Sequence, residues 1–236
     1  MADHPNGGGK GEGVIRRRGA LVSSAVLAVV VYVLMWIAIA LPWKWIEVVD
    51  QSALDTFYRF GTAHPGWVTG WDVFCTVLGP GAFRLTTLIV IVVALVKRRF
   101  PLAVFLVVCV ELSGLVTEAA KASVNRARPD TAFVSAWSTS FPSGHALGVM
   151  VAVLAWLTVV LPAVRRQRRG WLVALGVLVV VTIGIGRVVL NVHHPSDVLA
   201  GWAAGYAYFV LCLLVASPRR PISAADETPA APDTAQ

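Results

Sequence analysis

Charged side chains are scarce in this chain of 236 residues: they make up only 14% of it, whereas 57% of the residues are hydrophobic. About a quarter of an ordinary soluble chain is charged, so a soluble domain of this length would leave too much apolar surface in water. That surface must face lipid. Acidic residues are the scarcer kind, 13 against 20 Lys and Arg. The basic residues form short clusters between apolar runs, a pattern typical of membrane topology, and this disfavours nucleic acid as a partner.

Cysteine is also rare, with three residues and no spacing typical of a metal site. Cys109 and Cys212 lie within apolar runs, where cysteine behaves as a small hydrophobic residue. Cys75 is expected outside the membrane and unpaired. The cysteines therefore exclude a disulfide framework, and we predict neither a metal nor another cofactor.

Six apolar runs are candidates for membrane-spanning helices, each of which needs about 20 residues at about 1.5 Å per residue. They lie near residues 20–42, 82–97, 101–122, 144–163, 170–189 and 197–216. The second run is short, which leaves room for an earlier start within residues 67–81. We predict an all-α, polytopic membrane protein with a six-span domain over residues 20–217. Disordered cytoplasmic tails are expected at 1–19 and 218–236.

The connections between the runs predict the orientation. Every second connection is rich in Lys and Arg, as seen at residues 16–18, 97–99, 165–169 and 219–220. The positive-inside rule makes these segments cytoplasmic, so both termini are predicted inside the cell membrane. The extracytoplasmic connections are then residues 43–81, 123–143 and 190–196.

Two segments leave alternatives open. The first run follows an Arg cluster and contains Ala38-Ile39-Ala40, as a cleaved signal peptide would. It is longer than the usual apolar signal region of about 7–15 residues, which favours a retained span. Residues 43–81 are rich in aromatic side chains, which favour the membrane interface, and carry apolar residues at near-helical spacing. This segment is either an interfacial helix that shapes a lipid entrance or a simple aromatic anchor.

Polar and charged residues gather where the runs end on the predicted extracytoplasmic face. Lys121, Arg128 and Arg187 are cations from two separate connections. They would repel one another at a low-dielectric boundary unless an anion lay between them. A phosphate dianion would relieve this repulsion, and Arg suits it through bidentate hydrogen bonds. The segment 142–144 begins a helix, whose free N–H groups also favour an anion.

Two histidines would make such a phosphate site reactive. His193 lies just before a predicted helix start, and Asp197 in the first turn can reach back toward it. A carboxylate on Nδ1–H would fix the tautomer, leave Nε2 free as a nucleophile and stabilise a phosphohistidine. His145 is placed to protonate the leaving group and then to activate water. His194 competes for the nucleophilic role, but the spacing to Arg187 and Asp197 favours His193.

These residues fall into three blocks: Lys121 to Arg128-Pro129, then Pro142-Ser143-Gly144-His145, then Arg187, His193 and Asp197. The pattern resembles that of the type 2 phosphatidic acid phosphatase (lipid phosphate phosphatase) superfamily. One position departs from it, because Gly186 stands where the family most often has Ser, so that one hydroxyl donor is missing.

The resemblance implies six spans, an extracytoplasmic site and metal-independent hydrolysis. It also implies roles for individual residues. His193 would be the nucleophile, oriented by Asp197, and His145 the acid–base. The residues implied to bind the substrate phosphate are Lys121, Arg128, Ser143, Gly144 and Arg187.

We therefore predict an integral membrane phosphatase that hydrolyses a lipid phosphomonoester or diphosphate through a phosphohistidine. Phosphatidic acid, phosphatidylglycerol phosphate and polyprenyl diphosphate are candidate substrates. A lipid phosphotransferase would share the first half-reaction. A transporter of anionic lipids is the alternative from another class, but the runs show no obvious internal repeat and the charges lie at one face. No motif indicates the lipid or the oligomeric state.

Three other charged residues have weaker predictions. Glu111 and Glu118 lie seven residues apart, on one face of the third run. Glu118 is expected to hold Lys121 in place, and Glu111 to form a buried hydrogen bond to a neighbouring span. Arg126 is expected either to contact phosphate or headgroup, or to be solvated. Neither glutamate is predicted to be catalytic.

Overall fold

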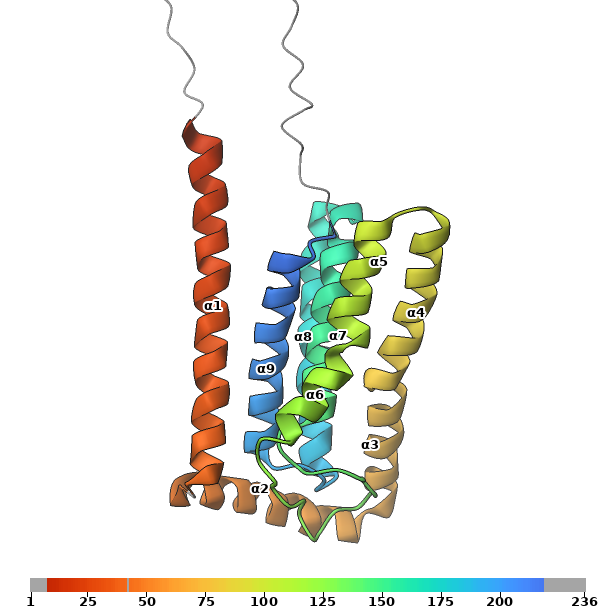
Figure 1. The fold of residues 1–236 in the computed structure, drawn as a ribbon. Coiled ribbons are helices and arrows are strands. Elements are labelled where there is room, and N and C mark those ends of the chain that lie inside the picture. The colour runs from red at the N-terminus through yellow and green to blue at the C-terminus, as the bar shows by residue number, and fades with distance from the viewer. Residues whose placement is uncertain (1–7, 42, 219–236) are drawn as a thin grey trace, which may run out of the picture.

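The computed structural model describes residues 8–41 and 43–218, and within these residues it contains helices and no strand (Figure 1). The helices are α1 Gly8–Ala40, α2 Lys44–Ala63, α3 Pro65–Val77, α4 Pro80–Val96, α5 Phe100–Leu106, α6 Ser113–Lys121, α7 Gly144–Val160, α8 Arg166–Val189 and α9 Pro195–Val215. A π-helical turn at Val107–Glu111 joins α5 to α6, and a 3-10 turn at Leu161–Ala163 follows α7. The all-α prediction is confirmed.

Six segments of the described chain are long and apolar enough to cross a membrane. They are Ile15–Ala40, Pro65–Val96, Phe100–Lys121, Gly144–Ala163, Arg166–Val189 and Pro195–Val215. They correspond one to one with the predicted runs, so the six-span, multi-pass prediction is confirmed. The second span begins earlier than its apolar run, as α3, and is interrupted at Gly79. A new helix starts there because Pro80 lacks an N–H but suits the first helical position.

The prediction for the N-terminal tail is wrong in part. α1 begins at Gly8, so residues 8–19, predicted to be disordered, are helical. The three arginines at 16–18 have high helix propensity and extend the helix of the apolar run toward the N-terminus. Residues 1–7 and 219–236, which carry the rest of the tail predictions, lie outside the described residues.

Residues 43–81 are mostly helical rather than an open loop. Figure 1 shows α2 lying across the end of the bundle, nearly perpendicular to the spanning helices. α2 buries Ile46, Asp50 and Leu54 on one side, while Trp45 on the outside is 61% exposed. Residues four apart share one face of a helix, so α2 is amphipathic, as the helical alternative predicted.

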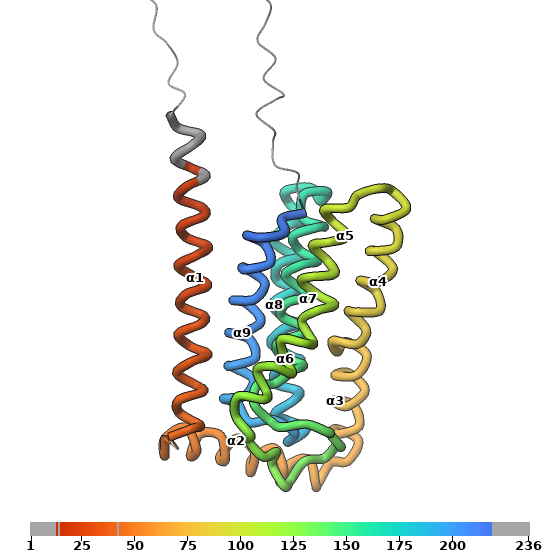
Figure 2. Tube along the Cα trace, viewed as in Figure 1, coloured from red at the N-terminus to blue at the C-terminus, as the bar shows by residue number. Residues whose placement is uncertain are grey.

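α7 and α9 form the centre of the bundle, with α1 packed along the outer side of α9 (Figure 2). Gly201 and Gly205 on α9 lie against the backbone of α7. A Cβ on Gly201 would stand 2.6 Å from the Ser143 carbonyl oxygen, and one on Gly205 would stand 2.8 Å from the Leu147 carbonyl oxygen. Small residues four apart let spanning helices approach this closely.

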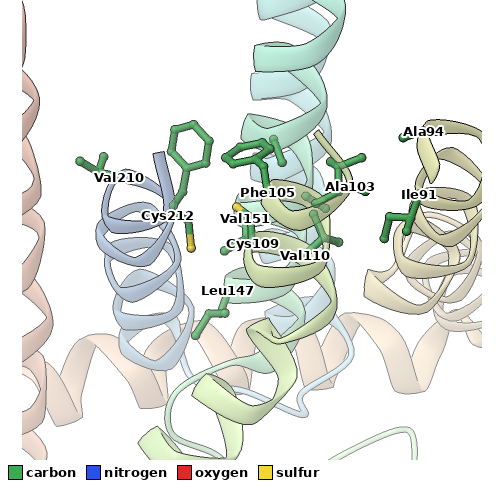
Figure 3. Close-up of a cluster of buried hydrophobic side chains, with 14 residues drawn as sticks. Ile91, Ala94, Ala103, Phe105, Cys109, Val110, Leu147, Val151, Val210 and Cys212 are labelled. Carbon is green, nitrogen blue, oxygen red and sulfur yellow. The ribbon is translucent and has the colours of Figure 1, made fainter. Parts of the chain in front are cut away.

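The largest buried cluster fills the space between α4, α5, α7 and α9 (Figure 3). It includes Phe105, Val110, Leu147 and Val151, all with an exposed fraction of 1% or less. Cys109 and Cys212 belong to the same cluster, as expected of cysteines that act as small apolar residues. All three cysteines are buried and free, in agreement with the prediction of no disulfide framework.

Candidate active site

The predicted site residues converge at the end of the bundle that α2 covers. Lys121 ends α6, Arg187 lies in the last turn of α8, and Asp197 lies in the first turn of α9. His145 is the second residue of α7, and its ring is close enough to Arg187, His193, Arg128 and Lys121 to be affected by their charges. The helix ends therefore bring together the three blocks that are separate in the sequence.

His193 occupies the turn between α8 and α9 and is only 2% exposed. Its Nε2 lies 3.2 Å from Nη1 of Arg128, which also donates a hydrogen bond to the Val192 carbonyl at 2.7 Å. Its Nδ1 has no hydrogen-bond partner among the described residues. The turn itself depends on Asn191, which has a φ of 52°, a left-handed conformation that Asn tolerates better than most residues.

Asp197 lies beside His193 but bonds more closely to His194. Its Oδ2 is 3.7 Å from His193 Nδ1, beyond hydrogen-bond distance. The same oxygen accepts a hydrogen bond from the backbone N–H of His194 at 2.9 Å and lies 3.0 Å from His194 Nδ1. The sequence placed Asp197 within reach of His193, and the structure shows that it orients His194 directly and His193 only through space.

Burial lowers the pKa of His193 to about 4. Asp197 opposes this shift, while the nearby charges of Arg128 and Arg187 add to it. At neutral pH the imidazole is therefore uncharged, with a lone pair on one ring nitrogen; on Nε2 this lone pair faces Arg128 Nη1. This is the form that a nucleophilic histidine requires.

The three predicted phosphate-binding cations have different surroundings. Lys121 donates from Nζ to the Ser138 hydroxyl and lies 3.9 Å from the carboxylate of Glu118, as expected for that pair. Arg128 donates from Nε to the Ser138 carbonyl at 2.7 Å, and burial and the charge of Arg187 lower its pKa. Arg187 is 7% exposed, its Nε has no partner, and no carboxylate of the described chain lies within 4.0 Å of it. The Cys75 thiol and the charge of Asp72 act on Arg187, but no carboxylate pairs with it directly. A buried charge without an ion-pair partner is unfavourable, so Arg187 is the cation best suited to a bound anion.

The start of α7 adds further donors. The Ser143 side chain caps the helix by accepting a hydrogen bond from the Ala146 N–H at 3.4 Å, which leaves its own proton available to a ligand. The Ser143 N–H donates to the Asp197 carbonyl at 2.9 Å and so ties α7 to α9. Gly144 packs closely, because a Cβ there would stand 3.1 Å from Thr117 Cγ2.

The absence of Ser at position 186 has a steric explanation. A Cβ on Gly186 would stand 2.5 Å from the Cys75 sulfur and 2.8 Å from the Trp71 ring. These side chains from α3 occupy the space that the serine would need. Gly186 therefore fits the local packing of α3 against α8.

An ion-pair network behind Asp197 was not predicted. Arg126 Nη1 lies 2.6 Å from Asp197 Oδ1 and donates to the Ser196 hydroxyl at 2.7 Å, while its Nη2 lies 2.8 Å from Asp50 Oδ2. The prediction that Arg126 is only solvated is therefore wrong, because both of its terminal nitrogens contact carboxylates. A contact with phosphate or headgroup stays a prediction. Although burial alone would lower its pKa, Asp197 and Asp50 raise it. The signal for Asp50 was an acidic residue in the apolar stripe of α2, four residues from Ile46 and from Leu54.

Two other expectations concern Glu111 and metal binding. Glu111 ends the π-helical turn, and its Oε1 is buried without a hydrogen-bond partner in the described chain, so this atom does not make the predicted interhelical bond. Within residues 8–41 and 43–218, no three His, Cys, Asp or Glu side chains are grouped so that they could hold a metal ion. The prediction of a metal-independent site remains one for experiment.

Comparison with known proteins gives consistent matches. The model of the PAP2 superfamily matches residues 102–221. Phosphatidylglycerophosphatase B of Bacillus subtilis is 37% identical over 101 residues, which cover 41% of this chain and 49% of the relative. Lipid A 1-phosphatase of Rhizobium etli is 33% identical over 122 residues, which cover 47% of this chain and 49% of the relative. Undecaprenyl-diphosphatase of Sulfolobus acidocaldarius is 38% identical over 66 residues, which cover 28% of each chain. The matches thus span about half the length of these relatives, or less.

The fold is also found in a solved structure. A crystal structure described as a transmembrane PAP2 type phosphatidylglycerolphosphate phosphatase from Bacillus subtilis matches with a TM-score of 0.64. The match covers 81% of this chain and 93% of that chain, at 22% identity. At this level of identity the likeness concerns the fold.

Proposed function

The chain belongs to the PAP2 superfamily, and on this premise we propose that it is a membrane lipid phosphatase that acts through a phosphohistidine at His193. The observation that carries the proposal is the placement of a buried, uncharged His193 beside Arg128, close to Arg187, whose Nε has no hydrogen-bond partner in the described chain. A neutral nucleophile next to two cations is suited to an anionic electrophile. A phosphate ester meets both requirements.

In the first half-reaction His193 Nε2 attacks phosphorus, and the bond from phosphorus to the lipid oxygen breaks. The negative charge of the bound phosphate favours a protonated His145. His145 then gives this proton to the lipid oxygen, which leaves as an alcohol or, from a diphosphate, as a phosphate group. Arg128 lies 3.2 Å from Nε2, so a phosphoryl group on Nε2 is within reach of its guanidinium. Lys121 and Arg187 offset the remaining charge on the equatorial oxygens.

In the second half-reaction water attacks the phosphohistidine, the P–N bond breaks, and inorganic phosphate is released. His145, now unprotonated, takes the proton from the water. While it is phosphorylated, the His193 ring is positively charged, and its Nδ1–H faces Asp197 Oδ2 from 3.7 Å. We expect this distance to shorten in the intermediate, because the carboxylate then faces a cation rather than a neutral ring.

The substrate is proposed to be a lipid whose phosphate reaches the bundle end while its tail stays in the bilayer. The relatives are named for phosphatidylglycerol phosphate, the 1-phosphate of lipid A and undecaprenyl diphosphate. These compounds share a terminal phosphate on a lipid. Together with phosphatidic acid, they make up the panel of substrates to test.

The test is phosphate release by the purified full chain in detergent, with EDTA present. We expect release from at least one lipid of the panel, and the His193→Ala variant should lose it by roughly a thousandfold or more. His64→Ala is the matched control, because His64 is exposed and its ring stacks on Phe60 outside the site. Release that persists in His193→Ala would contradict the phosphohistidine, and loss of wild-type activity in EDTA would contradict metal independence.

The same panel separates the alternatives. If no lipid releases phosphate from well-folded protein, but an added lipid alcohol receives the phosphate, the enzyme is a phosphotransferase. Binding of a phosphate lipid without any turnover would instead indicate a transporter.

A further inference from the structure

Asp50 is a carboxylate buried on the inner side of α2, with an exposed fraction of 2%. Its Oδ1 accepts a hydrogen bond from the backbone N–H of Ser196 at 3.0 Å. Its Oδ2 accepts one from the Ser196 hydroxyl and one from Arg126 Nη2 at 2.8 Å. A buried carboxylate is strongly unfavourable unless it is paired and hydrogen-bonded, and here both oxygens are satisfied by groups from the site end of the bundle.

Arg126 connects Asp50 to Asp197. One end of its guanidinium contacts Asp50 and the other contacts Asp197 Oδ1 at 2.6 Å. The guanidinium is planar, with its donors in a fixed arrangement, so it cannot turn toward one carboxylate without weakening its bond to the other. The second oxygen of Asp197 is held by Ser140 and His194.

Ser196 provides a second connection. It lies next to Asp197 in the first turn of α9, and both its N–H and its hydroxyl bond to Asp50. The position of α9 relative to α2 is therefore fixed by the same carboxylate. Among the described residues Asp50 bonds to Arg126 and Ser196 and forms no hydrogen bond or ion pair with His193.

We propose that Asp50 is a positioning residue, which acts through Arg126 and Ser196 to hold the Asp197 carboxylate beside His193. The inference rests on the proposed function, because Asp197 needs this position only if His193 accepts the phosphoryl group. His193 Nδ1 and Asp197 Oδ2 are already 3.7 Å apart, so a further displacement of the carboxylate would weaken its interaction with His193. A displacement of about 1 Å at a catalytic group can lower the rate about a hundredfold.

The test compares Asp50→Asn, which keeps the shape but removes the charge, with Asp55→Asn. Asp55 is exposed on the same helix, and its carboxylate accepts a hydrogen bond from Gln51 only. With a lipid of the panel as substrate, kcat of Asp50→Asn should fall about tenfold or more while KM stays within about threefold. Asp55→Asn should behave as wild type. A folded Asp50→Asn variant with wild-type kcat overturns the proposal, since a purely structural role would change thermal stability without changing kcat.

A double-mutant cycle tests whether the effect of Asp50 on Asp197 is transmitted by Arg126. If Asp50 acts through Arg126, then Asp50→Asn should lower kcat by no more than about threefold in an Arg126→Gln background. If the fold-losses in kcat of the two single variants multiply fully in the double variant, Asp50 does not act through Arg126.

A second variant covers the case in which Asp50→Asn does not fold. Arg126→Lys keeps the charge, but a single ammonium group cannot hold two carboxylates in the fixed geometry of the guanidinium. It should lose about tenfold in kcat, and wild-type kcat overturns the proposal. Failure of the proposed function gives a different result, namely a wild-type protein without phosphate release or a His193→Ala variant that keeps it.

Discussion

Two arginines of the site, Arg126 and Arg187, differ in how their charge is balanced. Arg126 contacts the carboxylates of Asp50 and Asp197, so its charge is balanced within the protein. Arg187 is buried more deeply than Arg126 but has no carboxylate within 4.0 Å among the described residues. Because an unbalanced buried charge destabilises a fold, we expect Arg187 to lower the stability of the empty protein and to favour the phosphate-bound state proposed above.

We therefore expect Arg187→Met to separate stability from activity. The empty variant should be more stable than wild type by about 1–3 kcal/mol, because an apolar side chain of similar length replaces an unpaired charge. Its kcat/KM for phosphate release should fall by about a hundredfold or more, because a cation that faces the phosphate is lost. Thermal unfolding in detergent and initial rates measure the two effects.

The matched control for Arg187 is Arg59→Met, on the exposed side of α2. It should change neither the melting temperature nor the rate. An Arg187→Met protein that unfolds at a lower temperature than wild type would show that Arg187 has a partner in the empty protein.

The depressed pKa of His193 predicts how stability depends on pH. The folded value is about 4, against an ordinary value of 6.5, so between these pH values the unfolded chain binds a proton that the folded chain does not. The free energy of unfolding should therefore decrease as the pH falls from 6.5 to 4, by about 3 kcal/mol from this residue. Melting temperatures of wild type and His193→Gln between pH 7 and pH 4 test this. The variant should lose less stability, and equal losses would contradict a neutral, buried His193.

At the scale of helices, apolar runs predicted the six spans because crossing a bilayer requires an uninterrupted apolar stretch. They did not predict that α1 extends to Gly8. The short second run did indicate an earlier start within residues 67–81, and the span begins just before that, at Pro65 in α3, with a break at Gly79 that the run did not predict. Length and composition set the number of spans. The position of each helix end depends instead on local propensity and on proline.

The site was predictable to the extent that its residues lie at helix ends. Lys121, Arg187 and Asp197 end or begin spanning helices, so topology alone brings them to one face. The bond between Asp50 and Ser196 joins residues 146 positions apart, and it depends on the direction in which α2 crosses the bundle. No local pattern specifies that direction, which is why the network of Arg126 was missed.

The contact between α7 and α9 gives a prediction at this scale. Gly201→Ala would place a Cβ 2.6 Å from the Ser143 carbonyl oxygen and 2.9 Å from the Ala146 Cβ, so the two helices must separate at the start of α7. We expect a loss of about 1–3 kcal/mol in stability and a lower rate of phosphate release. Gly70→Ala on α3 is the control, because a Cβ there meets nothing within 4 Å. Wild-type stability in Gly201→Ala would mean that the helices are not packed this closely.

At the scale of the whole molecule, basic clusters and the candidate site lie at opposite ends. The connection from α4 to α5 and the start of α8 lie at the end away from α2 (Figure 1), and these segments carry the clusters at 97–99 and 165–169. Lys and Arg near span ends favour the cytoplasmic side. We therefore propose that both termini are cytoplasmic and that the site opens on the extracytoplasmic side, where lipid phosphates of the outer leaflet are accessible.

Cysteine labelling tests this orientation, because the three native cysteines are buried and should give little background. Trp137→Cys places a thiol at a fully exposed position in the connection between α6 and α7, and Lys97→Cys places one at an exposed position between α4 and α5. In intact cells a membrane-impermeant maleimide should label Trp137→Cys and should label Lys97→Cys only after permeabilisation. The reverse pattern would place the site in the cytoplasm, and its substrates would then be lipid phosphates of the inner leaflet.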